Sequence, residues 1–141
     1  MNNIKNNLLK SDETLDDLQI KNIKIIQKSN GFRFGMDAVL LANFAKVKKG
    51  MRVMDLCSGT GIIPFILAGK TEAEKIFAIE IQEDMVEMGN RSITYNNLEN
   101  KINIIKGDIK NVKMLKNFDK FDIVTVNPPY KLKNSGLFES R

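Results

Sequence analysis

The most constraining feature of the sequence is a regular alternation of short apolar runs and helical stretches between residues 51 and 130. The apolar runs predict strands over residues 51–56, 75–81, 101–108 and 120–130. The stretches between them predict helices over residues 62–70 and 82–97 and a short helical turn over residues 112–115. Because strands joined through helices form right-handed crossovers, we expect an α/β fold: a parallel sheet with flanking helices.

The segment before this alternation, residues 1–36, is predicted to be a lead-in to a domain that spans residues 37–141. Its start is polar and partly flexible, and β-branched residues within residues 14–30 indicate a short β-type element. A helix follows, with Asp37 as its expected N-terminal cap and Lys48-Lys49-Gly50 as its expected end. The apolar residues that repeat at helical spacing in it are Val39, Leu40, Leu41, Phe44 and Ala45.

Composition excludes several classes of site. The chain has 141 residues and no His, which rules out Ser-His-Asp catalysis, Cys-His catalysis and His-ligated metals. Its single Cys57 can form neither an internal disulfide nor a thiolate cluster, so we expect no metal. No apolar run approaches the roughly 20 residues that span a bilayer, so we expect no membrane partner and a cytoplasmic location. The net charge of +5 favours a polyanionic partner without identifying one.

The turn after the first predicted strand, DLCSGTG (residues 55–61), has the composition of a ligand-binding loop. Gly59 and Gly61 permit a sharp turn and the close approach of a ligand. A dinucleotide fingerprint would need a third glycine where Pro64 stands, and Asp55 would repel a pyrophosphate. The same carboxylate attracts the cationic head group of S-adenosylmethionine, so the loop favours that cofactor. The alternative is a plain strand-to-helix turn in which Asp55 is a local cap.

Two further acidic residues lie at the ends of the next two predicted strands. Glu80 ends the second strand, where a carboxylate can accept both hydroxyls of a ribose, although a surface pair with Lys75 would also explain it. Asp108 ends the third strand and, with the Ile109 backbone, suits the amine and ring edge of an adenine. A Gly-Asp pair is equally a turn signal. Both positions extend the predicted cofactor site.

The tetrapeptide Asn127-Pro128-Pro129-Tyr130 at the end of the fourth predicted strand is the most specific feature. Prolines fix φ at about −65° and lack an N–H donor, so the loop presents carbonyl oxygens on a rigid frame. The Asn127 side chain and the Pro128 carbonyl can accept both hydrogens of a target NH₂ group, and the Tyr130 ring can stack on a base. The lone pair of that nitrogen is thereby aligned with the methyl donor. The alternative is a proline turn with Tyr130 as core filler.

Together, the motifs DLCSGTG, IEI, GDI and NPPY resemble those of class I Rossmann-like methyltransferases that act on amino groups. The lead-in GFRFGMDAVLLANF further resembles the bacterial tRNA (adenine-N6)-methyltransferase family that modifies valine tRNA. The resemblance implies S-adenosylmethionine-dependent methylation of the exocyclic N6 amine of an adenine, with tRNA as partner. The cofactor contacts it implies are Asp55, Cys57, Gly59, Gly61, Glu80, Ile81, Asp108, Ile109 and Asn127. The implied catalytic contacts are Asn127, Pro128 and Tyr130, and the implied substrate contacts are Arg33, Phe34, Pro129 and Tyr130.

The chain departs from this family in its number of strands. Such domains have further C-terminal strands that are missing here, so we expect the fourth strand to be an apolar edge able to pair with another chain. We therefore expect weak or no turnover from the chain alone. Three alternatives stay open: a glutamine methyltransferase that acts on release factors, a DNA adenine methyltransferase, and a non-catalytic fragment that binds cofactor or RNA.

Overall fold

The computed structural model describes residues 7–30 and 35–128 of the chain. Its elements in chain order are β1 (Glu13–Asp17), β2 (Lys24–Lys28), α2 (Met36–Phe44), β3 (Arg52–Leu56), α3 (Ile62–Lys70), β4 (Lys75–Glu80), α4 (Glu83–Tyr95), β5 (Ile102–Lys106), α5 (Val112–Leu115) and β6 (Ile123–Val126). Strands β3 to β6 form a parallel sheet in the order β5-β4-β3-β6, and β1 and β2 form a separate antiparallel hairpin. The predicted α/β fold with a parallel sheet is confirmed.

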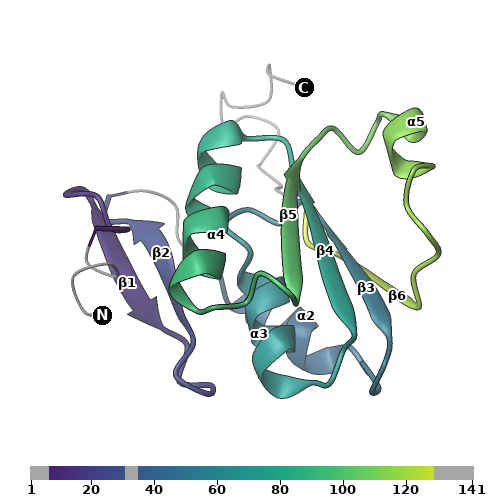
Figure 1. The fold of residues 1–141 in the computed structure, drawn as a ribbon, viewed down its shortest axis with the longest axis horizontal. Coiled ribbons are helices and arrows are strands. Elements are labelled where there is room, and N and C mark those ends of the chain that lie inside the picture. The colour runs from purple at the N-terminus through teal and green to yellow at the C-terminus, as the bar shows by residue number, and fades with distance from the viewer. Residues whose placement is uncertain (1–6, 31–34, 129–141) are drawn as a thin grey trace.

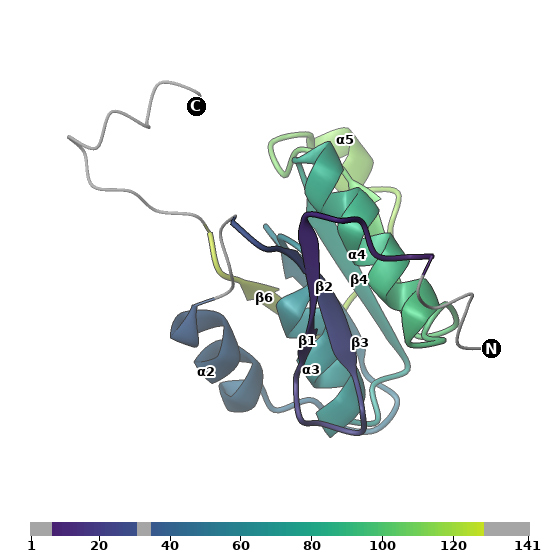
Figure 2. The ribbon, with the colours of Figure 1, turned by 90° about the vertical axis from the view of Figure 1, so that its left-hand side faces the viewer.

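The central position of β3 follows from its apolar sequence. It pairs with β4 on one side and with β6 on the other, so that Leu56 lies opposite Ile79 and Val126. Helix α3 is apolar on all sides and almost entirely buried, as its sequence IIPFILAGK requires. Figures 1 and 2 show α2, α3 and α4 on the same side of the sheet. The core therefore lies between β3 and β4 and these helices.

The predicted and observed bounds of the elements agree best where an apolar run is flanked by turn residues. Helix α3 and the short helix α5 begin and end where predicted, whereas β5 and β6 are shorter than predicted. In place of the single β-type element predicted within residues 14–30, the structure has two strands, β1 and β2. The sequence ETLDD of β1 is polar and shows no apolar alternation, so it did not indicate a separate strand. The longest helix of the described ranges, α4, has 13 residues, and none of the helices there has the length and apolar character that crossing a membrane requires.

Helix α2 differs from its prediction at both ends and along its surface. Gly35 rather than Asp37 occupies the N-cap position, so the predicted cap was wrong, and Asp37 lies within the first turn. The helix ends at Phe44, before the predicted lysines, and Ala38 and Ala42 form its buried side. Of the predicted apolar stripe, Leu40 and Phe44 are 58% and 80% exposed. The stripe is therefore only half covered by the described part of the chain.

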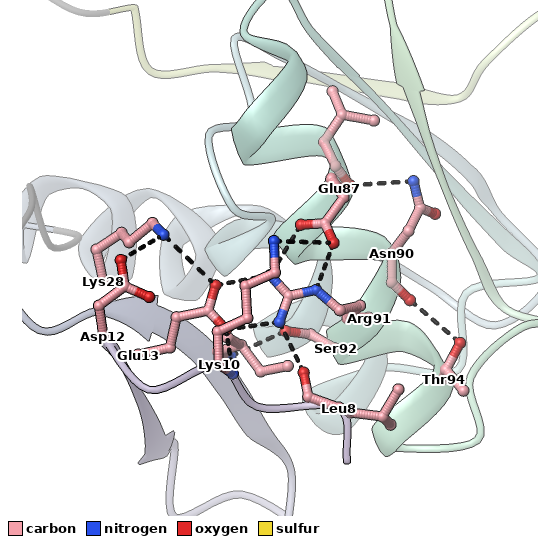
Figure 3. A network of polar contacts seen from close by, with 12 residues as sticks. Leu8, Lys10, Asp12, Glu13, Lys28, Glu87, Asn90, Arg91, Ser92 and Thr94 are labelled. Carbon is pink, nitrogen blue, oxygen red and sulfur yellow. Dashed lines mark hydrogen bonds and ion pairs between the residues drawn. The ribbon is translucent and has the colours of Figure 1, made fainter.

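Polar contacts attach the hairpin to α4, as Figure 3 shows. The Arg91 guanidinium donates to both carboxylate oxygens of Glu13, each at 2.6 Å, and to the carbonyl of Leu8. These hydrogen bonds keep the pKa of the buried Glu13 carboxyl below its usual value, and Glu13 and Glu87 together raise the pKa of Arg91. Whether residues 1–36 form a unit distinct from residues 37–141 stays a prediction.

Candidate active site at the carboxyl ends of the strands

The predicted site residues converge because parallel strands end at the same edge of a sheet. The register places Asp55 of β3 opposite Thr125 of β6, two residues before Asn127. On the other side, Glu80 at the end of β4 lies opposite Lys106 of β5. Asp55, Glu80 and Asn127 therefore belong to one edge of the sheet, the edge at which open α/β sheets bind ligands.

Asp55 is buried beneath the glycine loop and is only 1% exposed. Its Oδ2 accepts a hydrogen bond from Ser58 Oγ at 2.6 Å, and its Oδ1 accepts one from Thr125 Oγ1 at 2.7 Å. Burial raises the pKa of Asp55 to about 6; the two hydrogen bonds oppose this, and the nearby charge of Glu80 adds to it. Asp55 thus holds the loop in place through Ser58. Its expected direct contact with the cationic head group of S-adenosylmethionine stays a prediction.

Glu80 links the glycine loop to the start of α4. Its Oε1 accepts a hydrogen bond from the Gly59 amide and its Oε2 accepts one from the Gln82 amide, both at 2.8 Å. Lys75 instead donates to the carbonyl of Asn100, so the alternative of a Glu80–Lys75 pair was wrong. Each carboxylate oxygen has a further lone pair, so Glu80 can still accept the hydroxyls of a ribose.

The two glycines of the loop have different roles. Gly59 has a φ of 61°, and a Cβ built there would meet no other atom within 4 Å. Gly61 has a φ of 96°, but a Cβ there would approach Ile104 Cδ1 to 2.9 Å and the Phe65 ring to 3.1 Å. Gly61 is therefore required by the packing of α3 as well as by its left-handed backbone. Only Gly59 leaves open space beside the loop.

Cys57 begins the turn in a left-handed conformation with a φ of 58°, which is unusual for a residue that carries a Cβ. Its side chain is half-buried. Burial, and then the negative charges of Glu80 and Asp55, raise the pKa of the Cys57 thiol, so the thiol is held in its neutral form. This is the opposite of what a nucleophilic cysteine requires.

Beyond β5, the chain forms a turn at Asp108. The Asp108 side chain accepts a hydrogen bond from the Lys110 amide at 2.9 Å, and its carbonyl accepts one from the Asn111 amide. Asp108 is exposed, which leaves its second carboxylate oxygen accessible. Ile81 and Ile109, which follow the adjacent strands β4 and β5, are 58% and 38% exposed. Exposed apolar side chains beside carboxylates suit a ligand with a flat ring and polar substituents.

At the end of β6, Asn127 is half-buried and Pro128 is exposed. They follow Val126, which lies opposite Leu56 directly before the glycine loop. The predicted contacts Arg33, Phe34, Pro129 and Tyr130 lie outside the described residues. Of the predicted target-binding loop, the structure therefore places the first two residues beside the predicted cofactor loop.

The sequence interpretation missed Thr125 and Gln27, which both reach the glycine loop. Thr125 bonds Asp55, and Gln27 of β2 donates from Nε2 to Thr60 Oγ1 at 3.0 Å. Each is the polar member of an otherwise apolar run, IVTV and IIQ. A single polar residue on the buried face of a strand needs a hydrogen-bonding partner, which is the signal that could have identified both.

The sequence profile of the methyltransferase domain family matches residues 47–137. The chain belongs to this family. The matched segment contains β3 to β6 and the named site residues other than Gln27 and the predicted contacts Arg33 and Phe34. The expected resemblance to Rossmann-like methyltransferases is thus confirmed at the level of the family.

Two relatives of this methyltransferase domain have names that describe an action on tRNA. The tRNA1(Val) (adenine(37)-N6)-methyltransferase of Glaesserella parasuis is 30% identical over 112 residues, 79% of this chain and 46% of the relative. The protein of the same name from Haemophilus influenzae is 32% identical over 111 residues, 78% of this chain and 47% of the relative. The chain spans about half the length of these curated relatives.

The crystal structure of the M. jannaschii tRNA m1G37 methyltransferase has a similar fold. It superposes on 84% of this chain and 36% of its own chain, with a TM-score of 0.63 and 27% sequence identity. The superposed part is longer than the segment that matches the family.

Proposed function

We propose that this chain is the cofactor-binding part of an enzyme that transfers a methyl group from S-adenosylmethionine to the exocyclic N6 amine of an adenine in tRNA. The observation that carries the proposal is the hydrogen bond from Thr125 to Asp55. It ties the strand that leads into Asn127 to the strand that leads into the glycine loop. A methyl donor at the loop and an amine at Asn127 are thereby brought to one edge of the sheet. The names of the relatives supply the target.

The residues at this edge fit the proposed cofactor. The open space at Gly59 accommodates a ligand against the loop backbone, Glu80 can accept the ribose hydroxyls, and Ile81 and Ile109 offer apolar surface to an adenine ring. With a pKa of about 6, Asp55 is mostly ionised at neutral pH, so its charge favours a cation above the loop. When bound, S-adenosylmethionine supplies a methyl group on a positively charged sulfur.

The contribution of the protein to methyl transfer is orientation. The carboxamide oxygen of Asn127 and the carbonyl oxygen of Pro128 are acceptors for the two hydrogens of the target amine, which directs the nitrogen lone pair toward the methyl donor. An adenine amine is unprotonated at neutral pH, so no strong base is needed before attack, in keeping with a sequence that has no His. The excess proton of the methylated nitrogen passes to water.

The proposed partner is tRNA, and a net charge of +5 is consistent with a polyanionic substrate. Within the described residues, β6 is an edge strand whose Val124 and Val126 are 56% and 46% exposed. The similarity to this chain covers less than half of the length of each relative. We therefore propose that this edge pairs with another chain and that this chain alone turns over slowly. A cytoplasmic location stays a prediction.

The test separates cofactor binding from methyl transfer. Calorimetry with S-adenosylhomocysteine should show binding, and failure to bind at high micromolar concentration would remove the cofactor from the proposal. Labelled methyl groups should then be offered with unmodified tRNA, a release factor or duplex DNA, using the Haemophilus influenzae relative as the positive control. We expect slow incorporation into tRNA alone. Incorporation only into the release factor or the DNA would replace the proposed target.

Asn127→Ala tests the role of the target-binding loop. Removing the carboxamide should leave binding of S-adenosylhomocysteine largely unchanged, because Gly59, Glu80 and the isoleucines remain. Methyl transfer to tRNA should fall to background, because the amine loses one of its two acceptors. An equal loss of binding and transfer would show that Asn127 supports the fold of the site and does not orient the target.

A further inference from the structure

A buried glutamine connects the N-terminal hairpin to the glycine loop. Gln27 is 1% exposed, and its Nε2 donates to Oγ1 of Thr60, which stands between Gly59 and Gly61. Thr60 is itself only 7% exposed. Gln27 precedes residues 47–137, the segment that matches the methyltransferase family, so the family match assigns it no role.

The hairpin that carries Gln27 is fixed in place by α4. Besides the Arg91–Glu13 contact, the Ile26 amide donates to Ser92 Oγ at 2.9 Å, and both residues are fully buried. The Asn96 side chain accepts from the Lys24 amide at 3.0 Å and donates to the Lys24 carbonyl at 2.6 Å. Lys24 and Ile26 precede Gln27 in β2, and Glu13 pairs with Lys28, the residue that follows it. The Gln27 amide group is therefore presented to Thr60 from a rigid support.

Thr60 is held from two sides. At its backbone, α4 approaches so closely that a Cβ on Gly89 would lie 3.2 Å from the Thr60 carbonyl oxygen. At its side chain, the hydroxyl accepts the hydrogen bond from Gln27. The neighbouring loop residues are held elsewhere, with Gly59 bound to Glu80 and Ser58 bound to Asp55. Within the described part of the chain, the Gln27 hydrogen bond to Thr60 therefore links the hairpin to the loop.

We infer that Gln27 is a positioning residue for the cofactor site: it acts through the Thr60 hydroxyl to hold the Gly59–Gly61 turn in its ligand-binding shape. The inference rests on the proposed binding of S-adenosylmethionine at that turn. It makes the N-terminal hairpin part of the binding machinery.

Gln27→Met tests this inference, because methionine has nearly the same length and no hydrogen-bonding amide. In the protein without ligand, hydrogen–deuterium exchange followed by NMR should be faster at the Gly59 and Gly61 amides by about tenfold. The affinity for S-adenosylhomocysteine, measured by calorimetry, should fall by a similar factor. The midpoint of urea unfolding gives the stability of each variant, so that loosening of the loop is separated from unfolding of the chain.

Gln19→Met is the matched control, since Gln19 lies in the same hairpin but is exposed. It should leave loop exchange and affinity unchanged. Thr60→Val and the double variant complete a thermodynamic cycle. If Gln27 acts through Thr60, adding Gln27→Met to Thr60→Val should produce little further loss of affinity.

The outcomes separate this inference from the proposed function. Unchanged exchange at Gly59 and Gly61 in Gln27→Met would overturn the positioning role, whether or not the protein binds the cofactor. Additive losses of affinity in the double variant would also overturn it, because Gln27 would then act by a route other than Thr60. No binding by the wild type, together with faster loop exchange in Gln27→Met, would overturn the proposed cofactor but leave Gln27 as a determinant of the loop.

Discussion

Thr125 Oγ1 lies 2.7 Å from Asp55 Oδ1, and this hydrogen bond joins two strands that are 70 residues apart in the chain. The same carboxylate accepts from Ser58 through its other oxygen. Asp55 is therefore hydrogen-bonded both to the glycine loop that follows β3 and to the strand that leads to Asn127. Displacing Asp55 should disturb the predicted cofactor loop and the predicted target loop together, which makes it the structural centre of the site.

The burial of Asp55 predicts a specific dependence of stability on pH. Its pKa is about 6 in the folded chain and 3.8 when unperturbed, so between these values the folded protein binds more protons than the unfolded chain. The free energy of unfolding therefore falls as pH rises from about 4 to about 6, by up to about 3 kcal/mol from this group, and levels off above that range. Urea denaturation at several pH values measures this contribution.

Asp55→Asn isolates the contribution of this carboxyl from those of other acidic groups. The difference in free energy of unfolding between wild type and Asp55→Asn should change with pH below about 6 and stay constant above about 7. Asp119→Asn, at an exposed position, is the control. A difference for Asp55→Asn that is constant from acid to neutral pH would mean that Asp55 is not held in a desolvated environment.

The parts of the fold that the sequence predicted are those encoded by local patterns. The apolar run of β3 and the glycines after it have signatures within a few residues, and the structure reproduces them. Helix α2 could not be predicted as well, because its pattern does not reveal which side is covered. Its buried side is formed by Ala38 and Ala42, two small residues with weak hydrophobic signal.

The contacts that complete the site join residues far apart in the sequence. Gln27 and Thr60 are 33 positions apart, and Asp55 and Thr125 are 70 apart. No local periodicity reports such pairs; each becomes evident only when the sheet and the hairpin bring the strands together. Strand β1 was missed for a related reason, since its buried Glu13 is stabilised by contacts with Lys10, Lys28 and the distant Arg91.

The two loop glycines should respond differently to alanine. Gly61→Ala places a Cβ against Ile104 and Phe65 at a φ of 96°, so we expect a loss of stability of about 2–3 kcal/mol. Gly59→Ala meets only the strain of a φ of 61°, about 1 kcal/mol, but its methyl group enters the open space beside the loop. Urea unfolding should thus rank Gly61→Ala as the less stable. Calorimetry with S-adenosylhomocysteine should show loss of binding in Gly59→Ala, and normal binding there would place the ligand elsewhere.

Glu80→Gln tests the link between the two loops. A glutamine amide presents one acceptor oxygen, so either the Gly59 or the Gln82 amide loses its partner. Because each is a hydrogen bond to a charged group, we expect a loss of about 1.5–3 kcal/mol in stability. We also expect weaker binding of S-adenosylhomocysteine, since one acceptor for the ribose hydroxyls is replaced by an NH₂ group. Glu83→Gln, three residues further along, is the control: it removes only an exposed ion pair with Lys106, so it should change stability by less than about 1 kcal/mol and leave binding unchanged. Equal effects of the two substitutions would contradict a specific role for Glu80.

Removing only one partner of the Arg91–Glu13 ion pair should destabilise the fold more than replacing both partners. Arg91→Met leaves the carboxylate of Glu13, whose side chain is fully buried, without its bidentate partner. We expect a loss of about 3 kcal/mol in the free energy of unfolding near neutral pH. The pKa of Glu13 is lowered in the fold, chiefly by hydrogen bonds from Arg91, so the stability it provides is present above its unfolded pKa of 4.5 and is lost as pH falls below that value. The loss in free energy of unfolding caused by Arg91→Met should therefore be smaller at acid pH. The double variant Glu13→Gln/Arg91→Met should be more stable than Arg91→Met alone, because the buried carboxylate that has lost its bidentate partner is then replaced by a neutral amide. Urea unfolding of the three proteins at neutral and acid pH measures both effects. A double variant less stable than Arg91→Met would show that Glu13 stabilises the hairpin through contacts other than Arg91.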